Sequence, residues 1–255
     1  MSIVPIDKSF EISLNGTWRF KLENDGAAST KPLEQTLPEI TETSYEPFHG
    51  LDYTEDETWH DFTVPGNWEM AGYSPATYWN PDNASGEFRY WFEVPKSWKG
   101  RVVKINFDGV QNGAEIWVNG QPVSVTEPSW GRENYHESGW TAWQADITPV
   151  ARFGEKNLLA IRVTKNTKSA SLDSGDYFFL GGVYRPVTLF SVPQTHISDL
   201  TITTHLLPGN KAQVKVTVDV EGPDRPIVQM KLEDQEPLED EAWNNKAWFS
   251  QIVPK

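Results

Sequence analysis

Cysteine is absent from this chain of 255 residues. Its absence excludes disulfide bonds, thiolate metal sites and a cysteine nucleophile, and it leaves the redox compartment open. Long apolar runs are absent too, since none approaches the roughly 18–20 residues that a membrane-spanning helix needs. We therefore predict no membrane span.

The N-terminal residues 1–8 also lack the long apolar stretch of a secretory signal, so a signal is either absent or already removed. A removed signal would place the protein in the periplasm or outside the cell, and a chain without one would be cytoplasmic. The sequence leaves both compartments open.

Basic clusters and the common catalytic motifs are missing as well. The chain has 22 basic and 36 acidic side chains, a formal charge of −14, so it would repel a polyanion and we predict no nucleic-acid partner. It has no Gly-rich phosphate loop, no HExxH and no Gly-x-Ser-x-Gly nucleophile elbow. Its five histidines are scattered without metal-ligand spacing. Carboxylates are plentiful, but sequence alone does not show the spacing of roughly 5–10 Å that a glycosidase pair requires.

Aromatic residues are abundant instead, with 12 Trp, 8 Tyr and 12 Phe. Flat rings with polar tips suit the apolar faces of sugars, but large all-β cores also use many aromatic side chains. Composition alone leaves both explanations open.

Alternation of apolar and polar residues is the dominant pattern along the chain. Trp18, Phe20 and Leu22 share one face of a predicted strand. The same alternation recurs in four later stretches: residues 88–94, 103–107, 114–118 and 159–163. Asn119-Gly120 predicts a type I′ hairpin turn, in which both residues take positive φ. No segment carries a long apolar stripe of helical period, so we predict an all-β chain.

Long polar segments connect the predicted strands. Residues 23–61 are acidic and rich in Pro, Ser and Thr, and we interpret them as a surface excursion. Residues 66–86 and 127–140 carry several aromatic side chains. Because loops at one end of a β-sandwich often carry binding groups, these two segments are candidates for a binding site.

A second unit begins near Pro193, where two further strands are predicted at residues 199–204 and 211–220. About 60 residues follow this boundary, whereas an immunoglobulin-like sandwich needs roughly 100. We therefore predict one domain at residues 1–193 and an incomplete second domain at residues 194–255.

The segment 172–187 is the most unusual stretch of the chain. Two acids, Asp173 and Asp176, and several aromatic residues precede the pair Gly181-Gly182. Glycine permits backbone conformations that are closed to other residues. An acid held beside aromatic rings can hydrogen-bond sugar hydroxyls while a ring packs on the C–H face of the sugar. An ordinary tight turn, with Arg185 paired to a carboxylate, would explain the same residues.

Four motifs, in this order, resemble those of glycoside hydrolase family 2, the β-galactosidase and β-glucuronidase relatives. Residues 13–20 (SLNGTWRF) resemble the family's opening strand, and residues 64–73 (VPGNWEMAGY) resemble its Pro-x-x-Trp loop. Residues 116–120 (IWVNG) resemble its Val-Asn-Gly hairpin, and residues 181–187 (GGVYRPV) resemble its Gly-Ile-Tyr/Phe-Arg signature. Each motif is weak alone, but together they cover residues 12–193 and are specific.

The resemblance implies a jelly-roll, galactose-binding-like β-sandwich, followed by a partial immunoglobulin-like β-sandwich. In the family, two glutamates on a later TIM barrel act as general acid/base and nucleophile. We expect neither glutamate within these 255 residues. The chain alone is therefore predicted to be inactive.

The resemblance also implies which residues contact the sugar. In β-galactosidases of the family, an aspartate just before the Gly-Ile-Phe-Arg strand contacts the sugar and can ligate a sodium ion, and Asp176 matches that position. An asparagine of an earlier loop contacts the sugar as well. Asn80 is its nearest match, in a loop that is shorter than the family's. Trp68 and Tyr177 complete the predicted substrate-binding set, and no cofactor beyond sodium is expected.

These features predict the N-terminal sugar-binding domain of a β-galactosidase-like O-glycosyl hydrolase, which supplies one wall of the active-site pocket. Its partners would be a carbohydrate, such as a β-galactoside, and the downstream domains of the parent enzyme. The alternative is a free-standing carbohydrate-binding or structural module without catalysis. The sequence names neither the sugar nor the oligomeric state.

Overall fold

The structure is a computed structural model that describes residues 8–24, 47–78, 84–172, 175–233 and 235–254. The described chain is almost entirely β-strand. Its helices are three short 3-10 turns: η1 (Lys8–Phe10), η2 (Lys96–Trp98) and η3 (Ser169–Ser171). None of the described helices has the length and apolar character needed to cross a membrane. The predicted all-β fold is confirmed.

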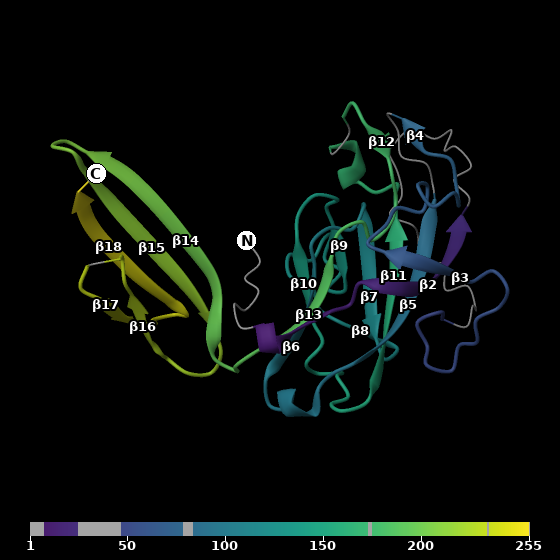
Figure 1. Ribbon diagram of the computed structural model, residues 1–255, viewed down its shortest axis with the longest axis horizontal. Coiled ribbons are helices and arrows are strands. Elements are labelled where there is room, and N and C mark those ends of the chain that lie inside the picture. Colours follow the sequence, from purple (N-terminus) through teal and green to yellow (C-terminus); the bar gives the residue numbers. More distant parts are fainter. Residues whose placement is uncertain (1–7, 25–46, 79–83, 173–174, 234, 255) are drawn as a thin grey trace. The chain divides into compact units, whose positions relative to one another are not determined.

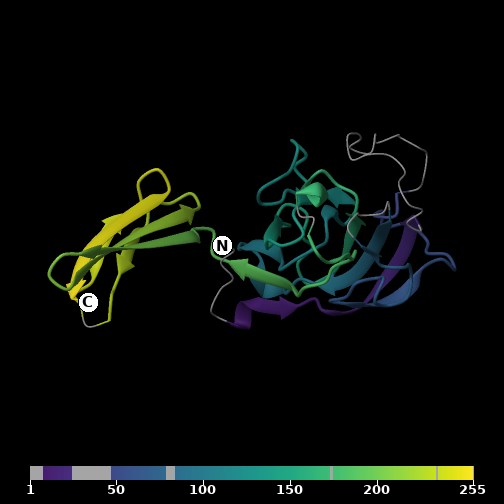
Figure 2. The ribbon, with the colours of Figure 1, turned by 90° about the horizontal axis from the view of Figure 1, so that it is seen from above.

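The chain divides into two compact units. The first comprises the described parts of residues 8–99 and 103–191, and the second comprises residues 100–102 and the described parts of 192–254. Figure 1 and Figure 2 colour the first unit from purple to green and most of the second from green to yellow.

Two antiparallel sheets form the first unit. The smaller has the order β1 (Glu11–Ser13), β13 (Val187–Val192), β6 (Val102–Phe107) and β10 (Trp143–Asp146). The larger has the order β3 (His60–Val64), β2 (Gly16–Asn24), β5 (Ser85–Glu93), β11 (Lys156–Thr164), β7 (Gly113–Val118) and β8 (Gln121–Pro122), and β9 (Tyr135–Glu137) pairs with β7. The predicted β-sandwich is therefore confirmed.

The core of this unit contains the inner faces of both sheets. Trp18 and Phe20 of β2 are buried, as their alternation predicted, and they share one cluster with Ile105 of β6 and Leu189 of β13. The ring of Phe20 lies 4.8 Å from that of Phe88 on β5, centroid to centroid. Burying each such ring stabilises the fold by roughly 1.5–3 kcal/mol, so the aromatic residues serve the core in large part.

The Asn119-Gly120 turn joins β7 to β8 as predicted. Both residues have positive φ, 53° and 80°, and Val118 lies opposite Gln121 across the two-residue turn. The Asn119 side chain also accepts a hydrogen bond of 3.0 Å from the Leu158 backbone N–H of β11. Both the turn type and this bond favour asparagine at the position.

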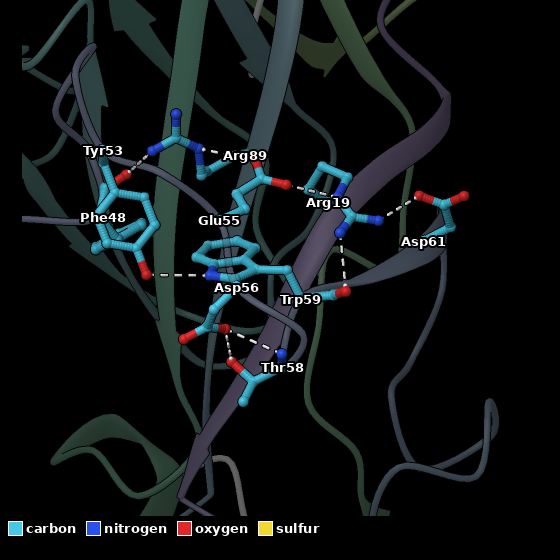
Figure 3. Close-up of polar contacts among 9 residues, drawn as sticks. All are labelled: Arg19, Phe48, Tyr53, Glu55, Asp56, Thr58, Trp59, Asp61 and Arg89. Carbon is cyan, nitrogen blue, oxygen red and sulfur yellow. Dashed lines mark hydrogen bonds and ion pairs between the residues drawn. The ribbon is translucent and has the colours of Figure 1, made fainter.

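The prediction that residues 23–61 form a surface excursion is wrong for residues 47–61, which the structure describes. Residues 47–59 pack on the outer face of the larger sheet, where Phe48 and Trp59 are buried against Ala160 of β11 (Figure 3). His60 and Asp61 belong to strand β3. The composition of this segment is polar, but its two buried aromatic side chains fix it to the sheet.

The second unit contains two small antiparallel sheets. One has the order β14 (His196–Leu207), β15 (Lys211–Glu221) and β18 (Lys246–Pro254), and the other pairs β16 (Ile227–Met230) with β17 (Leu238–Glu241). Val216, Val218 and Val220 of β15 form its core together with Phe249 of β18.

Candidate functional site

Two loops of the first unit meet in a small two-stranded sheet that carries the candidate site. Strand β4 (Thr77–Tyr78) pairs with β12 (Phe178–Phe179), with Tyr78 opposite Phe178. This pairing joins the segment after the Pro-x-x-Trp motif to the segment before Gly181. Residues 100 or more positions apart in the sequence therefore lie side by side at this site.

Asp176 lies at this junction with its side chain exposed. The Tyr78 hydroxyl donates a hydrogen bond to Oδ1 of Asp176. The Tyr78 ring in turn lies 5.2 Å from the Phe178 ring, centroid to centroid. A carboxylate that can accept hydroxyl hydrogen bonds thus stands beside exposed aromatic surface, which is the chemistry that suits a sugar.

Tyr177 is half-buried and points to different neighbours. Its ring contacts Trp140 at 5.5 Å between centroids, in a perpendicular arrangement, and Phe179 at 5.2 Å. Phe179 is buried. Tyr177 therefore follows Asp176 in the sequence, but its ring packs partly against the interior of the unit. Trp140, the last residue of the candidate binding segment 127–140, is exposed beside it.

Trp68 lies in the core. Its side chain is 0% exposed, and its ring stacks at 6.0 Å on Phe20 and at 6.5 Å on Phe88. A Cβ added to Gly181 would lie 1.9 Å from this indole, so only glycine fits there. A buried ring has no surface for a ligand, so the structure assigns Trp68 a packing role in place of the predicted substrate contact.

A buried ion pair that contacts Gly181 was not predicted from the sequence. Glu69 Oε1 lies 2.7 Å from Lys165 Nζ, and both side chains are 1% exposed. Glu69 Oε2 accepts a hydrogen bond of 2.8 Å from the Gly181 backbone N–H. Burial raises the pKa of Glu69, and the Lys165 ammonium opposes that rise. The pair ties Gly181, five residues after Asp176, to the 66–72 segment.

Arg185 does not pair with a carboxylate within the described residues. Its Nη1 donates to the backbone oxygens of Trp140 at 3.2 Å and Asp108 at 3.4 Å. The neighbouring Tyr184 hydroxyl donates to the Gly139 oxygen at 2.5 Å. The tight-turn alternative, with an Arg185–carboxylate pair, is therefore not observed. These two side chains instead hold the loop that ends at Trp140.

Two predicted features of the site stay predictions. Asn80 lies outside the described residues. In the described part of the chain, no group of three or more His, Asp or Glu side chains could hold a metal ion. Asp176 and the Tyr78 hydroxyl are two oxygen donors, which fits one side of a site for a hard cation, and further donors would have to come from elsewhere.

The comparisons with known proteins agree on one family. The sequence model described as "Glycosyl hydrolases family 2, sugar binding domain" matches residues 12–193. A β-galactosidase of Clostridium acetobutylicum is 29% identical and covers 93% of this chain, and the large subunit of a β-galactosidase of Latilactobacillus sakei is 27% identical and covers 89%. The chain spans only 28% and 37% of the lengths of these relatives.

Solved structures share the fold at lower identity. A β-glucuronidase of Bifidobacterium dentium complexed with coumarin-3-O-glucuronide matches all of this chain with a TM-score of 0.69 and 18% identity, over 44% of its own length. A β-glucuronidase of Bacteroides uniformis matches 95% of the chain, and 27% of its own length, with a TM-score of 0.66 and 21% identity. The family model covers well over half of the sequence, so this chain belongs to glycosyl hydrolase family 2, and its first unit is the sugar binding domain of that family.

Proposed function

We propose that this chain forms one wall of the active-site pocket of a β-galactosidase-like glycosidase. In this proposal Asp176 hydrogen-bonds the sugar, and the two catalytic glutamates stand on a TIM barrel elsewhere in the parent protein. The chain would hold the substrate without cutting it.

The observation that carries the proposal is the exposed Asp176 carboxylate beside Tyr78 and Phe178. Asp176 occupies the position before the Gly-Gly-Val-Tyr-Arg motif where the resemblance expects a sugar contact. A hydrogen bond between a charged carboxylate and a hydroxyl contributes about 1.5–3 kcal/mol, which is enough to select one sugar over its epimer.

The charge at the site supports a neutral sugar. Within the described residues, no lysine or arginine forms an ion pair with Asp176. A glucuronate ligand would bring its own carboxylate close to Asp176, where none of these described side chains offsets the repulsion between like charges. We therefore favour a β-galactoside over a β-glucuronide, in line with the names of the curated relatives.

Two observations test the proposal. The gene sequence beyond codon 255 should encode a barrel with an Asn-Glu pair, and a stop codon there would favour the free-standing module.

The purified chain should release no nitrophenol from 4-nitrophenyl β-D-galactopyranoside. Robust turnover that a single carboxylate substitution abolishes would contradict the proposal, because it would place catalytic machinery inside this chain.

A further inference from the structure

Phe178 and Tyr78 form an exposed aromatic surface next to Asp176, and neither residue belongs to the substrate-binding set predicted from the sequence. Their side chains lie directly opposite each other in the β4–β12 pair, and residues in that relation share one face of a sheet. Phe178 is 55% exposed and Tyr78 is 43% exposed. The next residue, Phe179, is buried, as the alternation along a strand requires.

The Asp176 carboxylate is fixed to this aromatic surface. Tyr78 contributes its ring to the surface and donates its hydroxyl hydrogen to Oδ1 of Asp176. The bond to Tyr78 engages Oδ1 and leaves Oδ2 as a further acceptor for a ligand hydroxyl. A sugar whose hydroxyl bonds to this carboxylate can therefore place a C–H face on the Phe178 ring.

The stereochemistry of the sugar decides how well it fits such a ring. In galactose the C–H bonds at carbons 3, 4 and 5 share one face, whereas in glucose the C–H bond at carbon 4 lies on the opposite face. An aromatic ring gains more contact from the continuous galactose face. Because aromatic contacts contribute to affinity beyond the area they bury, we expect this difference to change the affinity by roughly two- to tenfold.

We propose that Phe178 is the platform on which the sugar packs, and that it makes this site prefer galactose-configured sugars over their glucose-configured C4 epimers. The inference rests on the proposed function, because it requires that Asp176 holds the sugar. It adds a specificity-determining residue, and it names the face of the ligand that this residue recognises.

The test measures the affinity of the 255-residue chain for methyl β-D-galactopyranoside and methyl β-D-glucopyranoside by ligand-observed NMR titration. Wild type should bind the galactoside roughly two- to tenfold more tightly than the glucoside. Phe178→Ala should bring this ratio close to one, and Phe178→Trp should keep it. Trp91→Ala is the matched control, because Trp91 is a similarly exposed aromatic residue (45%) on strand β5.

The variants test separately whether Asp176 holds the sugar and whether Phe178 determines the preference for galactose. Asp176→Asn should weaken the binding of both glycosides, and binding that is absent in wild type or insensitive to this substitution would overturn the proposed function. Binding that depends on Asp176 but keeps its galactoside preference in Phe178→Ala would overturn the platform alone. An equal loss of preference in Trp91→Ala would also overturn the platform, because the effect would then not be specific to the site.

Discussion

At the scale of single residues, the site depends on how firmly the Asp176 carboxylate is oriented. Tyr78 is the side chain whose hydroxyl bonds to it, and the pairing of β4 with β12 sets the position of that tyrosine. A carboxylate with a fixed direction loses less freedom when it binds a sugar, so its hydrogen bond contributes more to affinity.

Tyr78→Phe keeps the aromatic ring and removes only the hydroxyl donor to Asp176. We expect the affinity for methyl β-D-galactopyranoside to fall by roughly two- to tenfold, the equivalent of one ordinary hydrogen bond. Tyr73→Phe is the control, because the Tyr73 hydroxyl bonds to the backbone oxygen of Asp61. Equal affinities of wild type and Tyr78→Phe would show that this hydroxyl does not orient Asp176.

A second prediction at the scale of residues concerns Glu87, on the outer face of β5, and the pH dependence of folding stability. It accepts hydrogen bonds of 2.6 and 3.2 Å from Arg162, and burial nevertheless raises its pKa from 4.5 to about 6. The folded chain therefore holds this proton more tightly than the unfolded chain does. The resulting stabilisation is fully present below about pH 4.5 and is lost as the pH rises through about 6.

Glu87→Gln removes this titration. The free energy of unfolding of wild type, measured relative to that of Glu87→Gln, should fall by about 1 kcal/mol between about pH 5 and pH 7.5. Urea unfolding followed by tryptophan fluorescence measures both values, and Glu93→Gln, an exposed acid of the same strand, is the control. A difference that is constant with pH, or that grows as pH rises, would contradict the raised pKa.

At the scale of elements, residues 47–59 act as a strap that neutralises like charges on neighbouring strands. Arg19 of β2 and Arg89 of β5 lie directly opposite each other, a pairing that alone destabilises a sheet. Glu55 of the strap lies between them, with one carboxylate oxygen 2.6 Å from Arg19 Nε and the other 3.2 Å from Arg89 Nε (Figure 3). Arg89 is 3% exposed, and it also donates to the Phe48 backbone oxygen.

Glu55→Ala leaves the buried Arg89 guanidinium beside Arg19 without a carboxylate. We expect a loss of about 3 kcal/mol in the free energy of unfolding of the first unit. Asp61→Ala removes the other carboxylate that pairs with Arg19. Because the Asp61 side chain is 71% exposed, this variant should lose less than about 1 kcal/mol in the free energy of unfolding. Urea unfolding of the two variants compares them directly, and equal losses would contradict the bridging role of Glu55.

At the scale of the whole molecule, the features that could be predicted from the sequence are those that neighbouring residues determine. The alternation of Trp18 and Phe20 predicted a strand with its buried face, and Asn119-Gly120 predicted the hairpin, because both signals come from neighbouring residues. The position of Asp176 came from a motif that lies next to it. These are the parts of the fold and of the site that short-range physics determines.

Contacts between residues far apart in the chain could not be predicted from the sequence. Glu69 and Lys165 are 96 positions apart, and no local pattern brings them together as a buried ion pair. The same holds for the pairing of Tyr78 with Phe178, which creates the exposed surface beside Asp176. Trp68 stands in a loop, where alternation does not tell a buried ring from an exposed one. Each of these features requires the folded arrangement of two segments.

The central claim for the whole chain is that it holds a galactoside through Asp176 and does not cleave it. One NMR titration of the 255-residue chain with phenyl β-D-galactopyranoside follows binding by line broadening and cleavage by the anomeric proton signal. We predict binding that Asp176→Asn weakens, while the anomeric signal of the intact glycoside stays constant. Accumulation of free galactose, or equal binding by wild type and Asp176→Asn, would contradict the account.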